Sequence, residues 1–314
     1  MAVAYLPVMY WDLGSGWTVT LVYVMTLAQL FLHTCKCICD FRIQYQIVSP
    51  QRYGTMVFVA SAVAGIVGVG FSWLFALMVD RNTGGNPYFF CMLVAAILLA
   101  VAAFFNSRLV PIYSQPKPRR TVIGLGEQWK ILMEDRSFRC LLIPNLLRGI
   151  TMSVTSCIVL FALVMDIDES GRAKIPMVCA LATVLASVIY IALRKNLSMG
   201  ILNIVGGILT CALVFLPRGN TQGFLLMLFV SHLGRTIVDN AVPIMLFPLV
   251  KPGIAGLYNP WRCVLYGICS LLVTPIISTL IECVPPLLLL VPGALTYLVV
   301  TAWYYIICRE LQKS

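Results

Sequence analysis

Ionisable side chains inside long apolar segments are the first candidates for chemistry in this sequence. His232, Arg235 and Asp239 occur in SHLGRTIVDNAVP (231–243) at positions i, i+3 and i+7, which places them on one face of a helix. Arg235 and Asp239 are also an i, i+4 pair of opposite charge. Two roles fit this pattern: the residues line a polar cavity that binds a charged solute, or they form an ion pair that joins buried helices.

Three further polar residues extend this candidate set. Asn145 and Arg148 are spaced i, i+3 in the apolar segment 141–165, where Arg148 either faces the same cavity or extends to the cytoplasmic surface. His33 occurs in another apolar segment, either in the cavity or as a packing residue. A histidine ionises near neutral pH, so His232 is the candidate carrier of a coupling proton. The predicted substrate- and ion-binding residues are therefore His33, Asn145, Arg148, His232, Arg235 and Asp239.

Other chemistries find no support in the sequence. The motifs HExxH, GxSxG, GxGxxG and the Walker loop do not occur, and the chain has only two histidines. The cysteines of CKCIC (35–39) are spaced by two, which brings only Cys35 and Cys39 to one helix face, whereas a structural metal ion needs about four converging ligands. We therefore expect no catalytic residues, no metal site and no cofactor, and we do not expect an enzyme.

The composition requires lipid as the solvent for most of the chain. Of 314 residues, 60% are hydrophobic and only 11% are charged, and the mean hydropathy is +0.93, whereas about a quarter of the residues in soluble proteins are charged. The net charge of +10 does not indicate a nucleic-acid partner, because the basic residues fall between apolar runs instead of forming one polar face. The sequence predicts an all-α membrane protein whose partners are the lipid bilayer and a small-molecule substrate.

The elements that must position these residues are membrane-spanning helices of about 20 residues each. Apolar runs bounded by Pro, Gly or charge predict nine spans, with the Pro285-Pro286 turn separating the last two. Aromatic residues near their ends, such as Trp303 to Tyr305, are expected to be interfacial anchors. The predicted limits are 17–39, 54–79, 88–106, 141–165, 175–193, 198–216, 223–250, 258–281 and 284–308.

The basic residues indicate how these helices are oriented. Sixteen of the 22 Lys and Arg residues lie on one side of the predicted spans, four lie on the other side and two lie within spans. Loops rich in Lys and Arg stay in the cytoplasm. We therefore expect a multi-pass protein of the plasma (cell) membrane with its amino terminus outside and its carboxyl terminus in the cytoplasm.

An internal repeat is visible when the chain is aligned with itself. Residues 47–70 align without gaps with residues 249–272, and the alignment pairs Pro50 with Pro252 and two glycines with two glycines. Both segments lead from a cytoplasmic loop into a predicted span. Weak self-similarity of this kind is typical of secondary transporters built from two related halves.

The chain resembles the major facilitator superfamily of secondary transporters over nearly all of its length. The resemblance rests on SPQRYG (49–54) followed by the Gly-rich AGIVGVG (64–70), on EDRSFRCLLIPNLLRGI (134–150) and on ALRKNLSMGILNIVGG (192–207). It implies a helical bundle with three helices of the first half and six of the second, as though the first three transmembrane helices were lacking. The strong signature loop between the second and third helices of the family is missing with them.

This resemblance implies a domain organisation. Residues 1–16 are an extracellular lead or the remnant of a helix, and residues 17–106 are an incomplete amino-terminal half of three helices. Residues 107–140 are a cytoplasmic linker with an amphipathic helix, whose apolar face carries Leu125, Trp129, Leu132 and Met133. Residues 141–308 are the six-helix carboxyl-terminal half, and residues 309–314 are a cytoplasmic tail.

The function that the resemblance implies is secondary active transport of a small solute by alternating access, in which a proton is a candidate coupling ion. If His33 and Arg235 both line the cavity, its cationic character favours an anionic or hydroxyl-rich substrate. The alternative is a non-transporting remnant or membrane scaffold without a complete translocation path, because two six-helix halves normally enclose the transport cavity.

The orientation can be tested by cysteine accessibility. A cysteine introduced into residues 116–120 should react with a membrane-impermeant thiol reagent only after the cells are permeabilised, because this basic loop is predicted to be cytoplasmic. Labelling of the same position in intact cells would show that the predicted topology is wrong.

Overall fold

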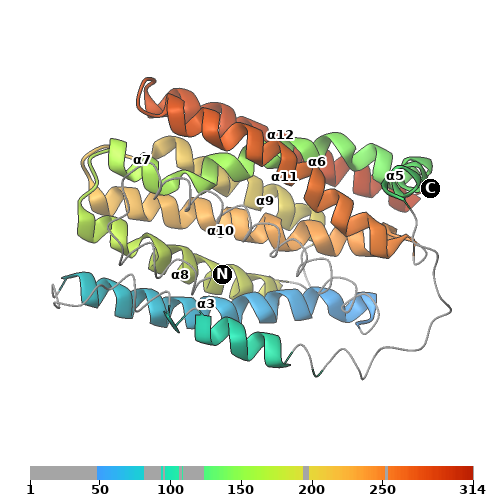
Figure 1. Ribbon diagram of the computed structural model, residues 1–314, viewed down its shortest axis with the longest axis horizontal. Coiled ribbons are helices and arrows are strands. Elements are labelled where there is room, and N and C mark those ends of the chain that lie inside the picture. Colours follow the sequence, from blue (N-terminus) through green and yellow to red (C-terminus); the bar gives the residue numbers. More distant parts are fainter. Residues whose placement is uncertain are drawn as a thin grey trace. The chain divides into compact units, whose positions relative to one another are not determined.

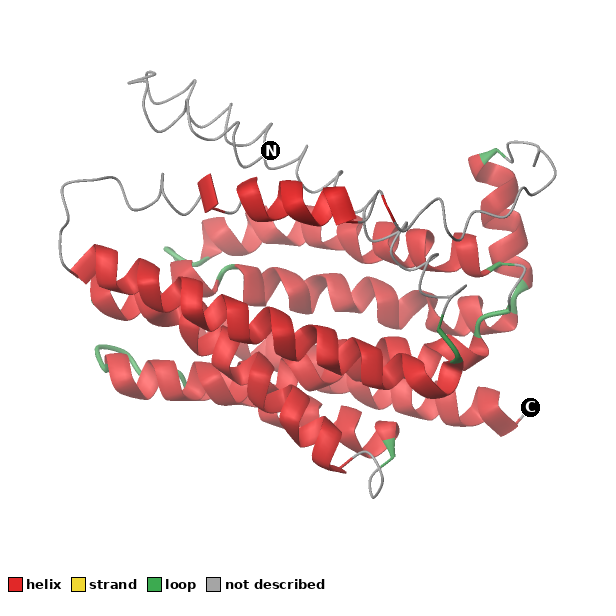
Figure 2. Cartoon of the chain, turned by 90° about the horizontal axis from the view of Figure 1, so that it is seen from below, coloured by secondary structure: helices red, strands yellow, loops and turns green. Residues whose placement is uncertain are grey.

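The computed structural model describes residues 48–80, 93–94, 96–105, 108, 124–193, 198–251 and 254–313. Every regular element in these ranges is a helix, as Figure 2 shows. Five of the described helices are long and apolar enough to cross a membrane, and the number rises to six if one bent pair counts as a single span. The protein is therefore an all-α, multi-pass membrane protein.

The described helices follow the predicted spans closely where the two can be compared. The amphipathic linker helix is present as α5, although Leu125 on its predicted apolar face is 72% exposed and only Leu132 is fully buried. The predicted span 17–39 lies outside the described residues, and 88–106 is represented by the shorter helix Ala96–Phe105. Nine spans therefore stay a prediction.

The helices labelled in Figure 1 and the short 3-10 helices are α3 (Pro50–Asp80), α5 (Leu125–Glu134), α6 (Arg136–Ser156), α7 (Ile158–Val164), α8 (Glu169–Leu193), α9 (Met199–Thr210), η2 (Cys211–Phe215), α10 (Thr221–Leu246), η3 (Phe247–Leu249), α11 (Ala255–Leu280) and α12 (Pro286–Lys313).

The chain divides into two compact units. One contains Met1–Val48 and Leu77–Gly124, and the other contains Ser49–Ala76 and Leu125–Ser314. In the first unit the described residues include the apolar helix Ala96–Phe105. Arg108 follows this helix, and its guanidinium carbon lies 5.2 Å from the centre of the Phe104 ring. The second unit holds most of the described residues.

Helix α10 forms the centre of the second unit because it packs against both α8 and α9, while α6 packs against α11 and α12. One apolar cluster joins these helices around the fully buried rings of Phe161 and Phe224. A second cluster is built around Phe58 of α3, whose ring stacks on Tyr190 of α8 at 3.6 Å between centroids. Helix α10 is therefore buried on several sides, which fixes the direction of the polar side chains that it carries.

Glycines allow the closest helix crossings. Gly206 of α9 faces Gly234 of α10, and a Cβ atom on Gly234 would lie 2.6 Å from both Leu209 Cβ and Thr210 N. Beside this crossing the Ser231 hydroxyl donates to the Thr210 carbonyl at 3.0 Å. Helices in lipid gain little from the hydrophobic effect when they associate, so small residues that permit close van der Waals contact decide where they meet.

A second close crossing joins α6 to α11 next to Arg148. A Cβ atom on Gly149 would lie 2.5 Å from the Tyr266 carbonyl oxygen and 2.6 Å from Cys269 Cβ. One turn further along α6, the Ser153 hydroxyl lies 3.1 Å from the Ser270 hydroxyl. These contacts hold the middle of α6 at a fixed height against α11.

Gly65 and Gly267, one of the two glycine pairs in the internal repeat, do not have the same surroundings. A Cβ atom on Gly65 of α3 would lie 2.7 Å from a methyl carbon of Val184 in α8, whereas Gly267 of α11 has open space at the same place. The alignment of these two glycines therefore does not reflect a shared packing role. The internal repeat as a whole stays a prediction, because part of it lies outside the described residues.

Helix α6 begins with a cap that the sequence supplies. Asp135 precedes the helix and accepts a hydrogen bond from the Phe138 N–H at 3.1 Å, which satisfies one free donor of the first turn. The same carboxylate lies 3.1 Å from the Lys251 ammonium, which follows η3. The start of α6 is thereby tied to the connection between α10 and α11.

The far end of α6 is bent. Helices α6 and α7 meet at 44° at Cys157 and are candidates for one broken span. The hydroxyls of Thr155 and Ser156 donate to the Met152 carbonyl, at 3.0 and 2.8 Å. Hydroxyl groups that bond back to carbonyls of the preceding turn compete with the helical hydrogen bonds and bend helices.

The turn between α7 and α8 carries a separate set of polar contacts. The pKa of Asp168 is lowered below its ordinary value, first because the Thr221 hydroxyl donates to its carboxylate and also because the Gly171 N–H does so. Next to it, Asp166 lies 2.8 Å from Arg218, and both side chains are largely exposed. This exposed ion pair is the natural comparison for the buried charges described below.

Replacement of Gly234 by alanine should destabilise the protein because the added methyl group collides with the backbone and side chains of α9. We expect a loss of roughly 1–3 kcal/mol, the usual cost of an overpacked core. Thermal unfolding of the purified protein in detergent measures the change. Gly267→Ala is the matched control, since its methyl group enters open space, and equal effects of the two substitutions would contradict the close crossing.

Candidate functional site

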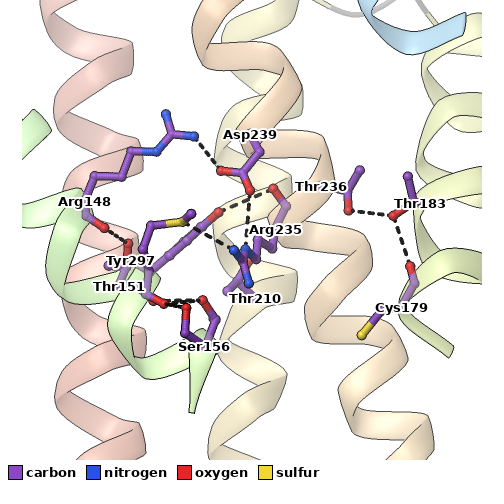
Figure 3. Close-up of polar contacts among 12 residues, drawn as sticks. Arg148, Thr151, Ser156, Cys179, Thr183, Thr210, Arg235, Thr236, Asp239 and Tyr297 are labelled. Atoms are coloured by element: carbon purple, nitrogen blue, oxygen red, sulfur yellow. Dashed lines mark hydrogen bonds and ion pairs between the residues drawn. The ribbon is translucent and has the colours of Figure 1, made fainter. Parts of the chain in front are cut away.

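Three charged side chains meet between α6 and α10. Asp239 accepts a hydrogen bond from Arg148 Nη2 at 2.6 Å through one carboxylate oxygen, and its other oxygen lies 3.3 Å from Arg235 Nε. Figure 3 shows Arg148 reaching across from α6 while Arg235 and Asp239 project from successive turns of α10. The carboxylate therefore bridges two guanidinium groups from different helices. We call Arg148, Arg235 and Asp239 the charged cluster.

The charged cluster lies deep along its helices and yet keeps part of its surface open. Arg148 and Arg235 are near the centres of α6 and α10, and the exposed fractions of their side chains are 15% and 19%, with 29% for Asp239. Charges that are largely removed from water cost several kcal/mol each unless opposite charges compensate them. One carboxylate compensates one of the two arginines, so the cluster as described carries one surplus positive charge.

The remaining contacts of Arg235 hold its backbone and one end of its guanidinium. The Tyr297 hydroxyl of α12 donates to the Arg235 carbonyl at 3.4 Å, and Arg235 Nη2 lies 3.3 Å from the Met152 sulfur. A thioether sulfur is only a weak acceptor. Figure 3 shows the Tyr297 ring passing between α12 and α10 toward this carbonyl. The arginine is therefore positioned by three helices while much of its donor capacity is not matched by strong acceptors.

Asn145 lies one turn before Arg148 and belongs to a fully buried pair. The Tyr304 hydroxyl of α12 donates to Asn145 Oδ1 at 2.6 Å, while Asn145 Nδ2 has no partner among the described residues. Arg148 also faces the Tyr304 hydroxyl. The expectation that Tyr304 is an interfacial anchor is therefore wrong: its ring is completely buried, because the polar end finds a partner inside the bundle instead of at the lipid headgroups.

Of the two histidines in the predicted set, only His232 lies within the described residues. His232 is half-buried on α10, one turn before Arg235, and interacts electrostatically with both Arg235 and Asp239. It belongs to the same face as the charged cluster, as the helical spacing predicts. His33 lies outside the described residues.

The structure brings together more residues than the sequence pattern identified. The i, i+4 contact of Arg235 with Asp239 was expected, but the shorter contact of Asp239 is with Arg148 from another helix. One signal for it exists in the sequence. Asp239 is the one acid in the predicted spans, and Arg148 and Arg235 are the basic residues that lie more than five residues from a predicted span end. No comparable signal identified Tyr297, Tyr304 or Met152, which look like ordinary apolar-span residues.

Within the described ranges, no group of three or more His, Cys, Asp and Glu side chains is arranged to hold a metal ion. The charged cluster instead offers guanidinium donors and a single carboxylate. That donor set suits a bound oxyanion or a hydroxyl-bearing solute, because arginine presents several N–H groups in a planar fork.

Comparison of the chain with protein-family models and with the sequences of curated proteins finds no match.

The buried Asn145 pair gives a stability prediction. Tyr304→Phe removes the donor to Asn145 Oδ1 and leaves that oxygen buried without it, which should cost roughly 1–3 kcal/mol. Thermal unfolding in detergent measures the loss. Tyr305→Phe is the control, because no hydrogen bond of its hydroxyl occurs in the described part of the chain and its ring is only half-buried. If both substitutions lower the melting temperature equally, the hydrogen bond contributes nothing specific.

Proposed function

We propose that this protein is a secondary transporter that moves a small solute across the membrane by alternating access. The observation that carries the proposal is the contact of Arg148 and Arg235 with Asp239 near the centres of two apolar helices. Ionised groups inside membrane spans are expensive, and they commonly mark the paths of ions or substrates. The partial exposure of all three side chains supports access by a solute.

The proposed fold is of the major facilitator type. Its support comes from the order of the elements: an amphipathic helix, α5, precedes six helical segments between residues 136 and 313, at the positions expected for a carboxyl-terminal half. The segments are α6 with α7, α8, α9 with η2, α10, α11 and α12. Among the described residues, the sequence motifs that resemble the family lie at the start and in the middle of α3, in the first part of α6, and at the end of α8 and in α9.

In the proposed mechanism, α6 and α10 carry the solute-binding residues, and one helix bundle rocks against the other around them. The bend between α6 and α7 supports such movement, because a broken span can change its angle at one point. The residue types of the charged cluster support binding of a solute, because two guanidinium groups and a carboxylate supply charge and hydrogen-bonding groups. The proposed location is the plasma membrane, with the carboxyl terminus in the cytoplasm.

A transport assay on the purified protein tests this proposal. Proteoliposomes with an alkaline interior are supplied with labelled lactate, succinate, phosphate, glucose, alanine and choline in separate experiments. The proposal expects uptake of at least one solute above that of protein-free liposomes and saturation at high concentration. Uptake that never exceeds the protein-free level for any of these classes would favour the non-transporting alternative.

Asp239 tests whether the charged cluster takes part in proton coupling. If Asp239 serves coupling, Asp239→Asn abolishes accumulation driven by the pH gradient and leaves counterflow exchange of the same solute. Asp166→Asn is the matched control, because it removes the same type of carboxylate from an exposed ion pair. Correctly folded Asp239→Asn protein with unchanged proton-driven uptake would contradict the coupling role, and loss of folded protein would indicate a structural pair.

A further inference from the structure

The charge of the cluster does not balance. Two guanidinium groups, of Arg148 and Arg235, share the single carboxylate of Asp239. Among the described residues, the ion pairs of these two arginines are those with Asp239, and further ion pairs such as Asp166 with Arg218 and Asp135 with Lys251 involve other residues. An uncompensated charge in a partly buried site is costly, and a bound anion removes that cost.

The hydrogen-bond donors are also in surplus. Each guanidinium has five N–H donors, and one nitrogen of each contacts Asp239. A second nitrogen of Arg235 contacts only the weakly accepting sulfur of Met152. Next to Arg148, the buried amide nitrogen of Asn145 has no acceptor within the described structure. Among the described residues, the second contact of Arg235 and the amide nitrogen of Asn145 thus lack an oxygen acceptor, and a ligand that brings oxygen atoms can form hydrogen bonds there.

The two arginines are held with unequal strength. Arg148 Nη2 lies 2.6 Å from a carboxylate oxygen of Asp239. Arg235 Nε lies 3.3 Å from the other oxygen, and Arg235 belongs to the same helix as Asp239. Arg148 and Asp239 thus form the close pair between α6 and α10. Arg235 is the surplus cation, and its backbone is positioned by Tyr297.

We propose that Arg235, together with Arg148, binds the carboxylate of a small monocarboxylate, with Asp239 as the counter-ion of both arginines when the site is empty. A ligand with one negative charge neutralises the one surplus positive charge of the cluster, whereas a dianion would give the site a net negative charge. The planar carboxylate also matches the fork of N–H donors on a guanidinium. This inference rests on the proposed transport function, for which it names the class of substrate.

Matched pairs of acid and amide test the inference on the full-length protein in detergent. Benzoate is compared with benzamide and lactate with lactamide, because the members of each pair have nearly the same shape and differ in charge. A ligand that binds only the folded protein raises the melting temperature with its concentration. We expect the acids to raise it in a saturable manner and the amides to have at least a tenfold weaker effect at equal concentration.

Arg235→Met separates binding from folding. It removes the surplus cation and leaves the close pair of Arg148 with Asp239 balanced, so the protein without ligand should melt at the wild-type temperature or above it. The apparent dissociation constant for the acids should rise at least tenfold. Arg218→Met is the matched control, because Arg218 pairs with Asp166 on an exposed turn, and it should leave the dissociation constant unchanged.

Three results would overturn the inference: equal stabilisation by acids and amides, unchanged affinity for the acids in Arg235→Met, or stabilisation by inorganic phosphate without stabilisation by the acids. The last result would assign the site to a phosphate-bearing ligand. Failure of this inference and failure of transport are distinguishable. Saturable uptake of glucose or choline without an acid effect would refute only the monocarboxylate site, whereas acid binding without uptake of any solute would refute only transport.

Discussion

A carboxylate shared by two guanidinium groups inside a lipid-embedded helix bundle is the constraint on which this structure depends. The contact of Asp239 with Arg148 at 2.6 Å joins α6 to α10, and an ionised group left alone at this depth would cost several kcal/mol. The two helices must therefore keep a fixed axial position relative to each other. A slip of one residue along either helix moves its side chains by about 1.5 Å along the axis, so the contact would lengthen or Arg148 would have to adopt another rotamer.

The packing around the charged cluster supplies that fixed position. Gly149 lets α6 approach α11 directly beside Arg148, and Gly234 lets α10 approach α9 one residue before Arg235. Tyr297 of α12 adds a hydrogen bond to the backbone of α10 at the same level. Since helices in lipid associate through close contact and hydrogen bonds more than through the hydrophobic effect, these small residues determine the height at which the charges meet.

The imbalance of charge favours solute binding over a purely structural role. A pair that only joined helices would need one cation for one anion, and Arg148 with Asp239 already meets that need. Arg235 adds a second cation whose other side-chain contact is a thioether. A cost of this kind is commonly retained where the unbalanced group has a ligand, because the ligand removes the cost when it binds.

The sequence alone determined the class of the protein and the helical face that carries its charges. Composition and apolar run length predict membrane helices, and the spacing of His232, Arg235 and Asp239 predicts their common face, because both depend only on local periodicity and on the thickness of a bilayer. Tertiary structure decided which side chains from distant segments meet that face. The contact of Arg148 with Asp239 and the burial of Tyr304 against Asn145 depend on how α6, α10 and α12 pack, and no local pattern encodes the height and rotation of one helix against another.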